Sequence, residues 1–226
     1  MNGLTDAPLL RLLQLSSPAL PIGAFAYSQG LEYAVSAGWV SDESSARGWL
    51  RGILSEAVAR LDLPILARAY GAWQSGDVAS AAEQSRFLLA CRESRELVLE
   101  DQHLGQSLAR VLAGHGIEAA RPWIRDPDAT FAVLYALAAT AWQIPLRAAL
   151  LGYAYTWAEA QTGALSRVLP LGQLAVQRIL FDVTDGAAAA ADLALTVPDD
   201  EIGSFSPSHA LASILHETQY TRLFRS

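Results

Sequence analysis

The 226-residue chain contains no lysine, and all 16 of its basic residues are arginine. A Walker-type phosphate loop needs a lysine at its end, and Schiff-base catalysis needs a lysine amine. Both mechanisms are therefore excluded. Glycine-rich phosphate loops are missing as well, since Gly23 and Gly172 stand isolated in the sequence.

Cysteine is almost as scarce, since Cys91 is the single one. One cysteine cannot form an internal disulfide, and such usage is typical of a reducing compartment. Residues 1–6 lack the basic start and the long apolar run of a secretory signal. We therefore expect a cytoplasmic protein.

Positive charge is also in short supply, because 23 acidic residues leave a formal net charge of −7. Nucleic-acid binding rests on basic surface, so the sequence predicts no nucleic-acid partner. One uncharged run of apolar character covers 18 residues, 129–146, the lower limit for a membrane span. It contains Thr130, Thr140 and Gln143, so we interpret it as a buried or subunit-interface helix and expect no membrane partner.

Alternation of apolar and polar residues with period 2 is almost absent, whereas helical spacing recurs throughout. Asp77, Asp126-Pro127 and Ser206-Pro207 read as helix starts, and Ser28 as a further N-cap. Residues 88–112 read as one long amphipathic helix. The sequence predicts an all-α fold: a single globular domain, 1–226, of about nine or ten helices.

An apolar stripe runs through the third predicted helix from Trp49 to Leu61, and a proline follows it at position 64. Pro64 is expected to kink or restart that helix, since proline lacks the backbone donor of a helix interior.

Histidine is present only four times, which limits metal chemistry. Glu100 and His103 form one Glu-x-x-His half-motif, but a di-metal helical site needs two such motifs. We interpret this stretch instead as a solvated helix face, with Glu96 and Glu100 one turn apart. His216-Glu217 lacks the second histidine of a zinc-protease motif. We predict no catalytic, cofactor-binding or metal-binding residues, leaving open a weak histidine site shared across a dimer.

The connector 16–32 is turn-forming yet apolar. Pro21 suits the second position of a turn and Gly23 suits its end. Loops are usually polar because they face water, but this one carries Leu20, Ile22, Phe25 and Tyr27. Either it packs onto its own core or it awaits a partner.

The last residues are unusually rich in large side chains for a terminus. Tyr220, Arg222 and Arg225 are of the types enriched among interface hot spots. Leu223 and Phe224 could equally fasten the last helix to the core. Both interpretations of the tail 218–226 remain open on the residues alone.

The connector resembles the N-terminal signature of UreF-type urease accessory proteins, reading S-P-x-L-P-I-G-x-F-x-Y-S-x-G-L-E from Ser17 to Glu32. Three later stretches resemble the same family in the expected order: 91–108, 167–178 and 216–226. Ala24 and Ala26 stand where the family often has serine, which removes possible hydroxyl hydrogen bonds without altering the turn.

The resemblance implies an all-α, non-enzymatic protein, commonly a homodimer. It implies a scaffold that bridges a UreD/UreH-type protein and the GTPase UreG while nickel is inserted into apo-urease. Two alternatives stay open: a UreG regulator that supplies an arginine in trans, Arg222 or Arg225, and a nickel carrier using His209 or His216.

The resemblance also assigns partner-binding positions to the connector and the tail. These positions are Pro18, Leu20, Pro21, Ile22, Gly23, Phe25, Tyr27, Ser28, Gly30, Glu32, His216, Glu217, Tyr220, Arg222, Leu223, Phe224 and Arg225. We further hypothesise that the Tyr27 ring meets Arg222 or Arg225, so that the two ends of the chain form one surface.

Overall fold

The computed structural model describes residues 4–226, and throughout that part of the chain the regular elements are helical. The all-α prediction is confirmed, as is the number of helices: α1–α11 make ten when α3, η2 and α4 count as one continuous helix. Residues 1–3, part of the segment searched for a secretory signal, lie outside the described residues. The elements are α1 Asp6–Leu15, η1 Ala24–Ala26, α2 Leu31–Ser36, α3 Glu43–Ile53, η2 Leu54–Asp62, α4 Leu63–Ser75, α5 Val78–Ala90, α6 Arg95–Gly114, η3 Glu118–Ile124, α7 Phe131–Ala141, α8 Leu146–Val168, α9 Gln173–Thr184, α10 Ala187–Ala194, η4 Asp199–Glu201 and α11 Pro207–His216.

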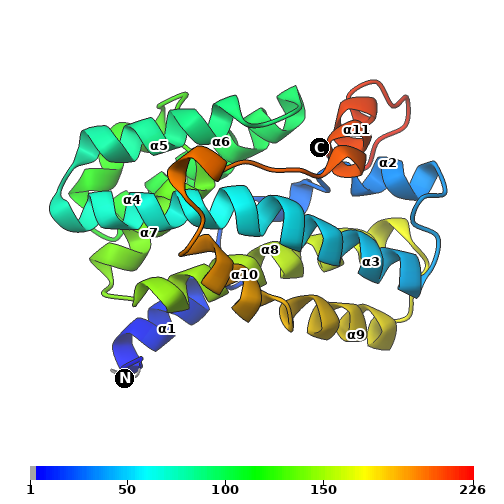
Figure 1. Ribbon diagram of the computed structural model, residues 1–226, viewed down its shortest axis with the longest axis horizontal. Coiled ribbons are helices and arrows are strands. Elements are labelled where there is room, and N and C mark those ends of the chain that lie inside the picture. Colours follow the sequence, from blue (N-terminus) through cyan, green and yellow to red (C-terminus); the bar gives the residue numbers. More distant parts are fainter. Residues whose placement is uncertain (1–3) are drawn as a thin grey trace.

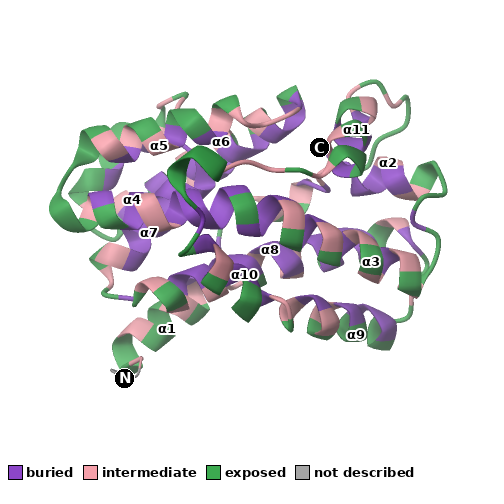
Figure 2. Ribbon diagram, in the orientation of Figure 1, coloured by how far each residue is buried: buried purple, intermediate pink, exposed green. Residues whose placement is uncertain are grey.

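Helix α7 lies at the centre of the core. Every residue from 131 to 139 is buried, and the helix packs against α4, α5, α6 and α8 (Figure 2). Burial inside the chain's own core explains why residues 131–139 carry no charge, which confirms the buried-helix interpretation for them. A subunit-interface role of the partly exposed residues 140–146 stays a prediction. Among the described residues, no helix is both long and apolar enough to span the lipid bilayer.

The longest helix runs from Glu43 to Ser75 across the middle of the molecule (Figure 1). Pro64 does not break it, because the widened π-helical turns of η2 come directly before. A proline at 64 leaves the carbonyl of Arg60 without its usual helical donor. The backbone N–H of Gly203 donates to that carbonyl instead, at 3.1 Å. The carbonyl that Pro64 leaves without a helical donor thus holds the segment that leads into α11.

Two predicted helix boundaries are wrong. The predicted helix 88–112 is two helices, since α5 ends at Ala90 and the Ser94 hydroxyl caps a new start by accepting from Leu97 N at 3.2 Å. Asp126 begins no helix, because its carboxylate accepts from Asp128 N in a local turn. Helix α7 starts only at Phe131.

Other local signals are confirmed. Asp77 caps α5 by accepting from Ser80 N at 3.0 Å, and α11 begins with Ser206 as N-cap and Pro207 as its first residue. Ser28 is not the N-cap of α2, because that position belongs to Gly30.

A buried ion cluster fixes α6 against the long helix. The Arg92 guanidinium contacts Asp62 at 2.5 Å and Asp101 at 2.6 Å, and Tyr153 donates its hydroxyl to Asp62 at 3.1 Å. Burial raises the pKa of Asp101, while the charge of Arg92 opposes that rise. Removing one member would leave an unpaired buried charge, which costs several kcal/mol.

Gly30 brings α2 against α11. Its φ is +78°, and a Cβ there would lie 2.6 Å from the backbone nitrogen of Ser213. A side chain is therefore excluded by both the backbone conformation and the contact. The role of Gly30 in this chain is close packing.

We expect Gly30→Ala to lower the free energy of unfolding by about 3 kcal/mol, since it adds a backbone clash to left-handed strain. Gly23→Ala is the matched control, because Gly23 has φ +81° with nothing within 4 Å of a Cβ. That variant should lose only about 1 kcal/mol. Urea unfolding of both variants checks this, and equal losses would contradict it.

Candidate functional site

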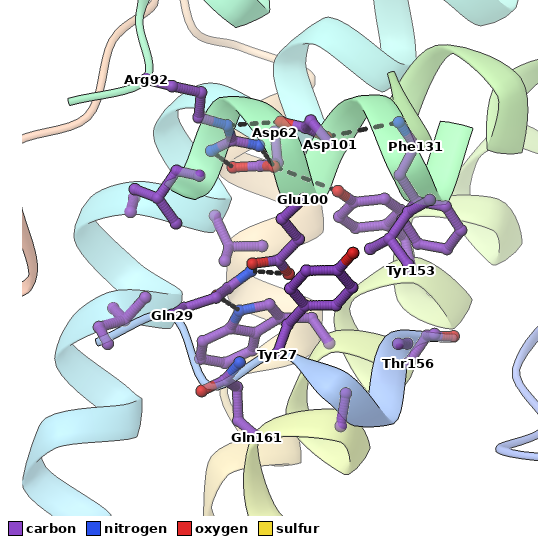
Figure 3. A pocket seen from close by; sticks show the side chains of 18 of the residues that line it. Tyr27, Gln29, Asp62, Arg92, Glu100, Asp101, Phe131, Tyr153, Thr156 and Gln161 are labelled. Carbon is purple, nitrogen blue, oxygen red and sulfur yellow. Dashed lines mark hydrogen bonds and ion pairs between the residues drawn. The ribbon is translucent and has the colours of Figure 1, made fainter. Parts of the chain in front are cut away.

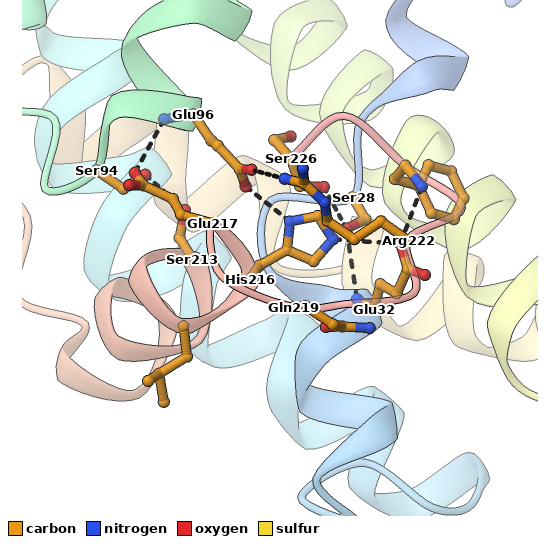
Figure 4. Close-up of polar contacts among 12 residues, drawn as sticks. Ser28, Glu32, Ser94, Glu96, Ser213, His216, Glu217, Gln219, Arg222 and Ser226 are labelled. Carbon is orange, nitrogen blue, oxygen red and sulfur yellow. Dashed lines mark hydrogen bonds and ion pairs between the residues drawn. The ribbon is translucent and has the colours of Figure 1, made fainter.

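The connector 16–32 and the tail 218–226 meet at one place. After α11, residues 217–226 reverse and run between α2 and α6 toward the connector (Figures 1 and 4). Arg225 N donates to Ala26 O at 2.9 Å, and Ser28 N donates to Ser226 O at 2.8 Å. The Ser28 hydroxyl donates to the same Ser226 oxygen. The tail is therefore part of the folded structure.

Glu32 of α2 holds the backbone of the tail. Its carboxylate accepts from Leu223 N at 2.7 Å and from Phe224 N at 2.9 Å. The same carboxylate lies 3.2 Å from Nε2 of His216. Because Glu32 is buried, these contacts replace the water that a carboxylate otherwise needs.

His216 lies between two carboxylates and has no exposed surface (Figure 4). Its Nδ1 is 2.7 Å from Glu96 of α6, opposite the contact between Nε2 and Glu32. Glu96 also accepts from the Arg222 guanidinium at 2.8 Å. We call Glu32, His216 and Glu96 together the Glu32–His216–Glu96 cluster. It joins α2, α6 and α11.

Glu217 stabilises the start of α6 from outside that helix. Its carboxylate accepts from Arg95 N at 2.7 Å and from Glu96 N at 3.3 Å. Negative charge is favourable at a helix N-terminus, where backbone N–H groups lack helical partners. Position 217, assigned to a partner by the resemblance, therefore has an internal contact.

Glu100 anchors the end of the tail one helical turn further along α6. It accepts from the Ser226 hydroxyl and from the Gln29 side chain, both at 2.9 Å. Gln29 in turn accepts from the Trp157 indole at 2.9 Å. Burial raises the pKa of Glu100 to about 7, although its two hydrogen bonds oppose that rise.

Arg225 of the tail reaches Tyr27 closely enough to lower the pKa of the phenol, although burial raises it more. The Tyr27 hydroxyl itself bonds His103 Nδ1 at 2.9 Å. Among the described residues, no cation–π contact joins the Tyr27 ring to Arg222 or Arg225, so the hypothesised contact stays a prediction. The cation–π contacts at this place come from another arginine.

Arg167 of α8 supplies those cation–π contacts. Its guanidinium lies 5.9 Å from the Phe25 ring centroid and 5.8 Å from that of Phe224. It also donates to the carbonyl oxygen of Phe25 at 3.1 Å. One residue of the connector and one of the tail are thus held by the same arginine.

The predicted partner-binding residues divide by exposure. Those buried in this chain are Leu20, Ile22, Tyr27, Ser28, Gly30, Glu32, His216 and Phe224, while Gly23 and Glu217 are half-buried. The exposed ones, which we call the tail face, are Pro18, Pro21, Phe25, Tyr220, Arg222, Leu223 and Arg225. The connector therefore packs onto the core through one set of side chains and exposes another set to solvent, and its binding of a partner stays a prediction.

A small cavity of about 50 Å³ lies beneath this site (Figure 3). Gln161 Oε1 and His209 Nε2, both among its lining residues, have no protein partner. Burial lowers the pKa of His209 to about 4, which keeps its ring neutral near pH 7. The cavity has room for one or two water molecules, far below the size of an ordinary ligand pocket.

Sequence reasoning missed the acidic residues of α6. Glu96 and Glu100 are buried, so the interpretation of a solvated helix face is wrong. The signal was available, because Glu100 falls in the helical stripe that joins Leu97, Leu104 and Leu108. Across residues 4–226, three or more metal-ligating side chains do not converge on a common point.

Glu100 makes stability depend on pH. The folded chain binds its proton more tightly than the unfolded chain, whose glutamate has a pKa of 4.5. The stabilising contribution is therefore full below about pH 4.5 and is lost as the pH rises to about 7.

We expect Glu100→Gln to gain stability relative to the wild type over that interval, by roughly 3 kcal/mol in all. Urea unfolding at several pH values measures the difference, and the exposed Glu83→Gln serves as the neutral control. A difference that stays constant with pH would contradict the assignment.

Comparison with known proteins identifies the family. A model of the UreF family matches residues 40–184, more than half of the chain. The chain is 49% identical over 216 residues to the urease accessory protein UreF of Alkalilimnicola ehrlichii, covering 96% of this chain and 95% of that one. It is 47% identical over 222 residues to the UreF of Pseudomonas putida KT2440, covering 98% and 99%. For the UreF of Chromohalobacter salexigens the identity is 45% over 218 residues, covering 96% and 94%.

The matches to these relatives leave at most 4% of this chain uncovered, so they include the connector, which lies outside the matched range 40–184. The chain therefore belongs to the UreF family of urease accessory proteins.

Proposed function

We propose that this protein acts in urease maturation as a non-enzymatic scaffold. It bridges a UreD/UreH-type protein and the GTPase UreG while nickel is inserted into apo-urease. We further propose, on the family resemblance, that it does so in the cytoplasm and as a homodimer. The observation that carries the scaffold proposal is the tail face, a set of exposed side chains on backbone that hydrogen bonds hold in place.

The anchors of the tail face are large and uncovered. Phe25 is 66% exposed, Leu223 is 63% exposed, and Tyr220 is fully exposed. Tyrosine and arginine are enriched among the residues that dominate binding energy at interfaces. Three large, exposed side chains in the connector and the tail therefore favour a protein partner.

The base beneath these anchors is rigid. Leu223 N is bonded to Glu32, and Phe25 O is bonded to Arg167. Backbone that is already ordered loses less conformational entropy on association, which favours affinity. Arg222 and Arg225 add positive charge at the rim, which favours an acidic surface on the partner.

We expect Tyr220→Ala combined with Leu223→Ala to weaken binding to the UreD/UreH-type protein by about 30-fold or more. Neither side chain has a hydrogen bond in the folded chain, so the melting temperature should stay within a few degrees. Isothermal titration calorimetry with the purified partner measures the effect.

Leu174→Ala combined with Phe181→Ala is the matched control, since these α9 side chains are 77% and 67% exposed. This control should bind the partner as the wild type does. Undiminished binding by the tail-face variant would refute the proposal, because the tail would then serve only internal packing.

An exposed arginine in the tail face permits the second candidate function, regulation of UreG by an arginine supplied in trans. The structure favours Arg225 for this role, since Arg222 is engaged by Glu96. Under the scaffold proposal, Arg225→Ala should leave the GTP hydrolysis rate of the bound UreG within a few-fold. A loss of about 10³-fold at saturating protein would instead establish the regulator.

A further inference from the structure

The Glu32–His216–Glu96 cluster needs a proton to be held together. Each ring nitrogen of His216 faces a carboxylate oxygen, at 2.7 Å on the Glu96 side and 3.2 Å on the Glu32 side. A neutral imidazole carries only one N–H, so it can satisfy one carboxylate and points a lone pair at the other. Both contacts are hydrogen bonds only when a second proton is bound.

The charges around the ring lead to the same conclusion. Helix α2 contributes Glu32, α6 contributes Glu96, and the tail contributes Arg222, which pairs with Glu96. Glu217 faces the α6 N-terminus and Glu100 faces Ser226, so neither balances the ring. Two carboxylates and one guanidinium leave one negative charge in excess, which one proton bound within the cluster neutralises.

Loss of that proton acts on the tail directly. Glu32 accepts hydrogen bonds from Leu223 N and Phe224 N in addition to facing His216. His216 is the last residue of α11, directly before the tail. A lone pair beside a buried carboxylate is repulsive, and a buried charge without its partner is costly. Moving α11 and the tail away from α2 relieves both.

We propose that docking of residues 217–226 takes up one proton at the Glu32–His216–Glu96 cluster, so that the tail face forms when this proton is bound and is released when it is lost. The proposal concerns the regulation of the tail face and rests on the proposed function for its biological use. The tail is docked in the structure of the chain alone, so docking can be tested separately.

The experiment uses the full chain without any partner. Amide hydrogen exchange of Leu223 and Phe224 reports on the bonds to Glu32, and protection factors corrected for intrinsic exchange are followed from pH 5.5 to 9. The Leu134 amide, bonded within α7 to Thr130 O, reports on global unfolding. Glu100→Gln is the background for every measurement, so that the titration of Glu100 does not contribute.

We expect the tail protection factors to fall about tenfold per pH unit above the point where the cluster loses its bound proton, while Leu134 stays protected. Ring ¹⁵N chemical shifts of His216 in the same background should change over the same interval. In Glu32→Gln the ring has only one carboxylate to satisfy, so the tail protection should become independent of pH.

Tail protection that is independent of pH with Glu32 present would overturn the proposal. Ring shifts showing a neutral imidazole throughout the docked state would overturn it as well, and they need no variant of the cluster. If the tail-face variant binds the partner normally while tail protection follows pH, the proposed function fails and this inference stands.

Discussion

Buried carboxylates on α2 and α6 are the constraint on which the end of the molecule that carries the tail face depends. Glu32, Glu96 and Glu100 lie inside the protein, where each needs donors in place of water. The tail supplies most of them, from Leu223 N and Phe224 N to the Arg222 guanidinium and the Ser226 hydroxyl. The exposed residues of the tail thus belong to a segment whose other groups donate hydrogen bonds to these buried carboxylates.

Helix α6 connects this end to the centre of the fold. Glu100 contacts the tail, while the next residue, Asp101, contacts Arg92 in the cluster that includes Asp62 of the long helix. The two polar clusters therefore share one helix. A partner that moved the tail would therefore disturb the hydrogen bonds between the tail and α6, a helix whose position is fixed by that ion cluster.

Local signals carried the sequence reasoning furthest. Asp77 and Ser206-Pro207 are helix starts because a cap acts within a few residues, and helical spacing alone indicated the all-α class. Contacts between distant residues were out of reach. Arg92 meets Asp62 across 30 positions, and Gly203 satisfies the carbonyl that Pro64 leaves open. The resemblance indicated the connector and the tail, but only the structure separates their buried residues from the tail face.

The bond between Ser28 and Ser226 spans 198 positions of the sequence. During synthesis the connector emerges among the first residues. Glu32 obtains its backbone donors, and Ser28 its acceptor, only after residues 223–226 have been made. Contacts of such sequence separation form late in folding, because the intervening chain must be ordered first. The surface that we assign to partners is therefore the last part to mature, and chains that stop short of the tail never present it.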